Sequence, residues 1–141
     1  MFKRILVALK FNSASKNALE KGINLAQVYG SYLFIFHALD YRLQNLDNEH
    51  LTLIQKTKEI EEKFEQEIKP LLDDLTNFTF KYSPADPALE VCKLAKDRNI
   101  DLIIIGCHQL MEKSCVGRID YIGMTILEMA PCPVMLVPIC D

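Results

Sequence analysis

Hydrophobic positions along this chain form short continuous runs, separated by segments in which apolar residues recur every three or four positions. The runs at Lys3 to Leu9, Ser31 to Leu39 and Asp101 to Gly106 predict strands, and the second is apolar nearly throughout. Such a run is typical of a parallel strand that helices cover on both faces. Two further strands are predicted at Phe78 to Tyr82, where the alternation is weaker, and at Pro133 to Val137.

A helix is predicted between the first two strands. Asn12 and Ser13 or Ser15 are good N-caps for it, and the apolar residues that follow have helical spacing. Gly30 stands where a C-cap would end this helix.

Three more helices follow in the sequence. A long amphipathic pattern predicts a helix from about Asn48 to Leu72, and Pro70 should end or kink it near its last turn. Ser83 to Pro87 is interpreted as a turn in which Asp86 caps the next helix. After strand four, a loop to about residue 118 precedes a short helix that ends at Met129.

This alternation of strands and helices predicts an α/β fold. The expected architecture is an open, mostly parallel, Rossmann-like sheet with helices on both faces and right-handed crossovers. The chain has 141 residues and no internal repeat, so residues 1–141 are expected to form one domain.

Charge and hydropathy exclude two broad classes of function. The net charge is -3, which gives no electrostatic basis for general nucleic-acid binding. The apolar runs are far shorter than the ~20 residues that a membrane span needs. The first residues lack a small-residue cleavage site and are interpreted as a buried strand rather than a signal peptide, so we expect a cytoplasmic protein.

The five cysteines have no paired spacing, and their odd number argues against a disulfide framework. Cys92 and Cys107 fall in or beside apolar segments and are interpreted as small buried side chains. The alternative is a metal or redox site built from Cys107, His108 and Cys115, although these three ligands are loosely spaced for zinc.

The last third of the chain resembles the C-terminal half of a universal stress protein. The residues that carry the resemblance are Asp101 to Gly106, the polar loop and short helix after them, and the closing run Ala130 to Pro138. Ile5 to Ala8 and Leu33 to His37 are similar to the family's first two strands. The resemblance implies strand order 3-2-1-4-5 and a ligand cleft at the carboxyl ends of strands one and four.

In that family a loop of pattern Gly-x2-Gly-x9-Gly-Ser/Thr holds the phosphates of ATP. In this chain only the first glycine of the pattern, Gly106, is present. If one residue is inserted, the second glycine is replaced by Gln109, the third by Asp120 and the hydroxyl residue by Tyr121. The family's ATP binders also carry an acidic residue where this chain has Lys10. The resemblance therefore implies a branch that lacks the ATP-binding signature and acts in stress adaptation through an unknown protein partner, with no catalysis demanded.

The alternative is an adenine-nucleotide (ATP or AMP) sensor with slow or no hydrolysis. His37 is interpreted as a structural histidine with a ligand contact as its alternative, and His108 as a loop residue that points towards the cleft. The resemblance implies this candidate set of nucleotide-binding residues: Ala8, Leu9, Lys10, His37, Ala38, Gly106, His108, Gln109, Asp120, Tyr121 and Ile122.

A homodimer is expected through strand five, which the implied strand order places at an edge of the sheet. The backbone N–H and C=O groups at this edge have no partner strand and can pair with another chain, and the run contains no lysine that would oppose such pairing. The prolines at both ends should limit pairing to about four residues. The expected interface comprises Pro133, Val134, Met135, Leu136 and Val137.

Overall fold

The computed structural model describes residues 1–39, 50–109 and 119–140. Its single sheet has five strands in the order β3-β2-β1-β4-β5, and every pair of neighbours is parallel, as predicted. The strands are β1 (Arg4–Ala8), β2 (Tyr32–Leu39), β3 (Phe78–Pro84), β4 (Leu102–Gln109) and β5 (Val134–Cys140).

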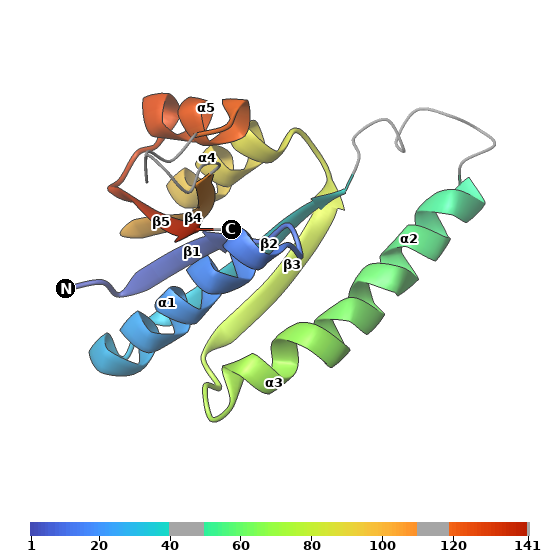
Figure 1. Cartoon of the computed structure of the whole chain (residues 1–141), viewed down its shortest axis with the longest axis horizontal. Coiled ribbons are helices and arrows are strands. Elements are labelled where there is room, and N and C mark those ends of the chain that lie inside the picture. The colour runs from blue at the N-terminus through green and yellow to red at the C-terminus, as the bar shows by residue number, and fades with distance from the viewer. Residues whose placement is uncertain (40–49, 110–118, 141) are drawn as a thin grey trace.

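Helices cover both faces of this sheet (Figure 1). One face carries α1 together with the long helical segment that ends in α3, and the other carries α4 and α5. The helical elements are α1 (Ser13–Tyr29), α2 (His50–Lys63), the π-helical η3 (Phe64–Ile68), α3 (Lys69–Leu72), α4 (Pro87–Asp97) and α5 (Tyr121–Met129). None of the helices in the described part of the chain is long and apolar enough to cross a membrane.

Two hydrophobic cores follow from the period of two along the strands. In β1, Ile5 and Val7 point towards α1, whereas Leu6 between them points towards α4 and α5, and all three are buried. A strand buried on both faces has no polar positions to alternate, which is why its sequence is a continuous apolar run.

The helix caps lie where the sequence predicted them. Of the candidates for α1, Asn12 is the N-cap, and its side-chain oxygen accepts from the Ser15 N–H at 2.9 Å. Gly30 ends α1 in the left-handed conformation with φ 64°. Asp86 caps α4 by accepting from the N–H groups of Ala88 and Leu89.

The predicted kink at Pro70 takes the form of a π-helical turn. The Lys69 N–H bonds to the Phe64 carbonyl, five residues back, across η3. Because a proline ring collides with the carbonyl four residues earlier in a regular α-helix, the wider turn before Pro70 relieves that contact. The helical path therefore continues through Leu72.

Three predicted boundaries were wrong. β3 continues to Pro84, into the segment that was interpreted as a turn, and β4 continues to Gln109 rather than ending at Gly106. β5 runs through Pro138 to Cys140 rather than ending at Val137, and all seven of its residues are in register with β4.

The geometry of the β4–β5 ladder explains why Pro138 is tolerated inside β5. The Ile103 N–H bonds to the Pro133 carbonyl, so alternate residues starting at Pro133 face β4. By the same alternation Pro138 turns its backbone nitrogen to the open edge, where no ladder bond is lost.

Candidate ligand-binding cleft

Two adjoining cavities lie at the carboxyl ends of the strands, at the point where the strand order reverses on either side of β1. Their volumes are about 320 and 240 Å³, and both are lined by Ala8, Lys10, Ile122 and Ile126. Open α/β sheets bind ligands at this switch point. We refer to the two cavities as the α1 cavity, which Asn12 and other residues at the start of α1 line, and the His37 cavity.

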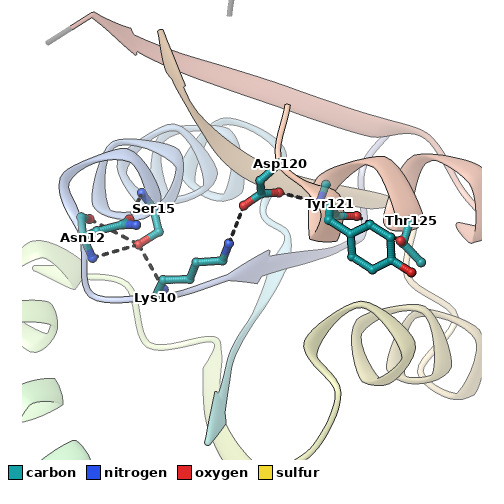
Figure 2. A network of polar contacts seen from close by, with 7 residues as sticks. Lys10, Asn12, Ser15, Asp120, Tyr121 and Thr125 are labelled. Atoms are coloured by element: carbon teal, nitrogen blue, oxygen red, sulfur yellow. Dashed lines mark hydrogen bonds and ion pairs between the residues drawn. The ribbon is translucent and has the colours of Figure 1, made fainter. Parts of the chain in front are cut away.

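An ion pair joins two walls of the α1 cavity (Figure 2). Lys10 Nζ lies 2.9 Å from Asp120 Oδ2, although the two residues are 110 positions apart in the sequence. The other carboxylate oxygen of Asp120 accepts from the Gly123 N–H at 2.7 Å and so caps α5. Lys10 and Asp120 are the charged residues among the described residues that line this cavity, so the described lining carries no net charge.

The surroundings of Asp120 keep its carboxylate charged. Partial burial raises the pKa of the carboxyl, but the hydrogen bond from Lys10, the bond from the Gly123 N–H and the charge of Lys10 outweigh it. The pKa of Asp120 therefore lies below its ordinary value, and the side chain is anionic near neutral pH.

The loop that carries Lys10 is fixed by a buried serine. Ser15 Oγ accepts from the backbone N–H of Lys10 at 3.0 Å and of Asn12 at 3.3 Å, and it donates to the Asn12 carbonyl at 3.2 Å. A hydroxyl has one proton to donate, so this serine is already committed within the loop.

Phe11 holds the same loop from the other side. It adopts the left-handed conformation with φ 59°, which is uncommon for a bulky residue. Its ring packs edge-on against His37 at 5.0 Å and against Phe80 at 6.5 Å, and this packing retains the strained backbone. The loop is thus constrained by packing on one side and by hydrogen bonds to Ser15 on the other.

His37 lines the second cavity as a neutral ring. Its Nδ1 lies 2.7 Å from the Leu9 carbonyl oxygen, which can only accept, so Nδ1 carries the proton. Burial lowers the pKa of His37; the bond to Leu9 opposes this shift, and the charge of Lys63 adds to it. The histidine is therefore uncharged near neutral pH and has a structural hydrogen bond.

Gly106 is required by the packing of α1 on β4. A Cβ at this position would lie 2.4 Å from the Ala14 carbonyl oxygen and 2.8 Å from the Ser15 nitrogen. Both are backbone atoms, so the start of α1 approaches β4 more closely than any side chain allows. The single glycine that remains from the phosphate-loop pattern thus has a structural explanation.

The structure brings most of the candidate residues to these cavities, but not all of them. Tyr121 is 84% exposed and lines neither cavity; its ring points away from the Lys10–Asp120 pair (Figure 2). His108 was expected in a loop, but its backbone and that of Gln109 extend β4, and their side chains lie outside the described residues. The candidate residues that line a cavity are Ala8, Leu9, Lys10, His37, Ala38, Gly106, Asp120 and Ile122.

Other cavity residues were missed by the sequence reasoning. Asn12 and Ser15 were identified as caps, and Leu136 as part of the edge strand, yet all three line the α1 cavity. A capping pattern immediately after strand one was the available signal, because the first helix begins at the carboxyl edge of the sheet.

The thiol site proposed as an alternative lies partly outside the described residues. Cys107 is buried and lines the α1 cavity, and Cys92 is buried as predicted, whereas Cys115 and the His108 side chain are not described. Within residues 1–39, 50–109 and 119–140, no group of three metal-ligating side chains comes together.

Comparison with known proteins identifies the family. The model of the universal stress protein family matches residues 1–138. This chain belongs to that family. No protein of curated function matches it.

Solved structures share the fold at low sequence identity. UspA from Lactobacillus plantarum is 17% identical with a TM-score of 0.78, over 96% of this chain and 97% of that one. The hypothetical protein MJ0577 is 20% identical with a TM-score of 0.80, over 99% and 97%. The Archaeoglobus fulgidus protein in complex with dAMP is 14% identical with a TM-score of 0.69, over 96% and 97%.

Proposed function

We propose that this universal stress protein acts in stress adaptation by binding a partner protein, and that its cleft does not hold Mg-ATP tightly. In this proposal it represents a branch of the family with a degenerate ATP-binding signature. The observation that carries the proposal is the charge of the α1 cavity, where Lys10 and Asp120 cancel each other.

A triphosphate gains no net attraction from this pair. If Lys10 turns to a phosphate, Asp120 is left facing the anion, and two like charges ~4 Å apart at an effective dielectric of about 20 repel by about 4 kcal/mol. This repulsion offsets the attraction between Lys10 and the same phosphate, so the pair adds no net affinity. If Lys10 stays with Asp120, the phosphates meet a neutral pair.

The amino end of α5 is also occupied. Helix N-termini bind phosphate because their first N–H groups lack partners. In α5 one of these groups, the Gly123 N–H, already bonds to the Asp120 carboxylate, so a phosphate at this helix end would compete with the chain's own anion.

Calorimetric titration with Mg-ATP tests this argument. The wild type should bind with a dissociation constant weaker than about 100 μM. Asp120→Asn retains a good capping side chain but frees Lys10, so the cavity gains one positive charge and its affinity should rise. Asp97→Asn is the matched control, since this exposed carboxylate lies at the end of α4 and lines neither cavity. Low-micromolar binding by the wild type would contradict the proposal.

The second candidate function is an adenine-nucleotide sensor that takes a monophosphate. The His37 cavity favours it, because its walls are largely apolar and suit the flat face of a base. A structural relative has been solved with dAMP. Native mass spectrometry of the purified protein would reveal a co-purifying nucleotide. AMP binding tighter than about 100 μM would favour the sensor over the partner-binding role.

A further inference from the structure

Among the described residues, α4 and α5 leave part of their sheet face uncovered near β3. α4 packs against β1 and β2, and Figure 1 shows β3 at the far end of the sheet from α5. On this face Tyr32 is 37% exposed and Phe34 is half-buried, with their rings 4.8 Å apart. Between this part of the sheet and α4 lies a groove of about 70 Å³ with apolar walls that include Phe34 and Leu94. We call it the β2–β3 groove.

The charges at this groove are all of one sign. The charged residues that line the groove are Lys81, from β3, and Arg98, which follows α4. Across the described ranges, neither forms an ion pair, whereas Lys10, Lys16 and Lys69 each pair with a carboxylate. Two unpaired cations on an apolar groove, in a chain of net charge -3, favour an acidic ligand.

The backbone edge beside the groove is open for a short stretch. The Leu33 N–H bonds to the Asn77 carbonyl, so alternate residues of β3 starting at Thr79 face β2. Phe80 and Tyr82 therefore turn their N–H and C=O groups to the outer edge of the sheet, where none of the described strands lies beside β3.

The start of this edge is capped within the chain. The Phe78 N–H bonds to the Thr76 carbonyl, and the Phe78 carbonyl accepts from the Tyr32 hydroxyl at 3.2 Å. The edge available to a further strand is thus the part next to Lys81, and Phe80 and Tyr82 supply its donors and acceptors.

We propose that an extended, acidic segment of a partner protein adds as a strand to the edge of β3 and places its side chains over the β2–β3 groove. Side chains of an added strand alternate between the two faces of the sheet. Those on the groove face lie beside Thr79 and Lys81, so carboxylates meet Lys81 and Arg98 while an apolar side chain covers Phe34. This inference rests on the proposed function in that it requires a protein partner, and it names the surface that the partner contacts.

A competing explanation is that Lys81 only protects the edge from aggregation, as edge lysines commonly do. The two explanations predict different behaviour towards short strands. A protective lysine disfavours every added strand, whereas a docking lysine selects acidic strands over basic ones.

The test uses the full chain and two synthetic octapeptide libraries. In one, Asp or Glu alternates with Val, Ile, Leu or Phe; in the other, Lys or Arg replaces the acidic positions. Fluorescence anisotropy should show binding of acidic peptides and none of basic peptides. Reversing the charge at Lys81 (Lys81→Glu) should weaken the acidic peptides about fivefold, since a cross-strand attraction becomes a repulsion. Lys81→Glu with Arg98→Glu should transfer the preference to the basic library.

Lys96→Glu is the matched control. It makes the same charge change at an exposed position of α4 that does not line the groove, so binding should stay within about twofold. Amide hydrogen exchange locates the peptide: the amides of Phe80 and Tyr82 should slow on binding, because they face the open edge.

The proposal is overturned if no acidic peptide binds, if binding survives the double charge reversal, or if protection appears away from β3. These results are independent of the Mg-ATP titration, because Lys81 and Arg98 line neither cavity of the cleft. Tight ATP binding would therefore contradict the proposed function but leave the docking proposal standing. A lack of peptide binding would overturn the docking proposal alone.

Discussion

Replacing Gly106 by alanine should destabilise the protein markedly. The added methyl group would lie 2.4 Å from the Ala14 carbonyl oxygen and 2.5 Å from its carbon, closer than real Cβ contacts come. These atoms belong to the first turn of α1, which the Asn12–Ser15 capping box fixes. The helix must therefore shift to make room, and such overpacking costs about 1–3 kcal/mol.

That energy can be converted into a melting temperature. An unfolding entropy of roughly 2.1 cal/mol/K per residue gives about 0.3 kcal/mol/K for a chain of 141 residues. Each kcal/mol then lowers Tm by about 3 °C, so Gly106→Ala should melt about 3–10 °C below the wild type in differential scanning calorimetry.

Gly22→Ala is the matched control for this prediction. Its Cβ would lie 2.8 Å from Val7 Cγ2, which is the end of a side chain rather than backbone, and alanine favours the interior of α1 by about 1 kcal/mol. Its Tm should fall less than that of Gly106→Ala. A wild-type Tm for Gly106→Ala would refute the packing explanation and return this glycine to a role in ligand binding.

Three further predictions concern pH, assembly and metal. Burial holds the pKa of His37 below its usual 6.5, so the unfolded chain binds more protons than the folded chain as the pH falls below about 6.5. The free energy of unfolding, measured by urea titration, should therefore drop between about pH 7.5 and about pH 5.5. The drop should be smaller in His37→Gln. Light scattering should give a mass of roughly 32 kDa, twice the 16.2 kDa chain, for a dimer through the edge of β5. Val134→Pro removes an N–H group from the open edge and should shift the protein towards the monomer. Pro138→Ala adds an N–H group to the same edge and should leave the dimer intact. A chelator should leave Tm unchanged, and a clear drop together with about one zinc per chain would support the thiol site at Cys107 instead.

The fold was predictable because its determinants are local. Apolar runs mark strands buried on both faces, and Asn12, Gly30 and Asp86 mark helix ends through hydrogen bonds and backbone conformations that involve only a few neighbouring residues. The extent of β4 was not predictable in the same way. His108 and Gln109 are polar and resemble a loop, and they become strand only because β5 continues beside them to Cys140.

The cleft depends on contacts between distant parts of the sequence. Asp120 and Lys10 were identified as departures from the family's ATP-binding pattern, and nothing in the sequence showed that they pair across 110 residues. Gly106 resembled a remnant of a phosphate loop, because its contact with Ala14 exists only once α1 packs on β4. Sequence pattern supplied the residue types, and the fold decided which of them meet.

The measurement that tests the central claim most directly is the calorimetric titration of the wild-type protein with Mg-ATP. With Lys10 neutralised by Asp120 and the amino end of α5 already capped, the account predicts a dissociation constant weaker than about 100 μM. A constant of about 1–10 μM would show that the cleft attracts a triphosphate despite these contacts, and would contradict the account.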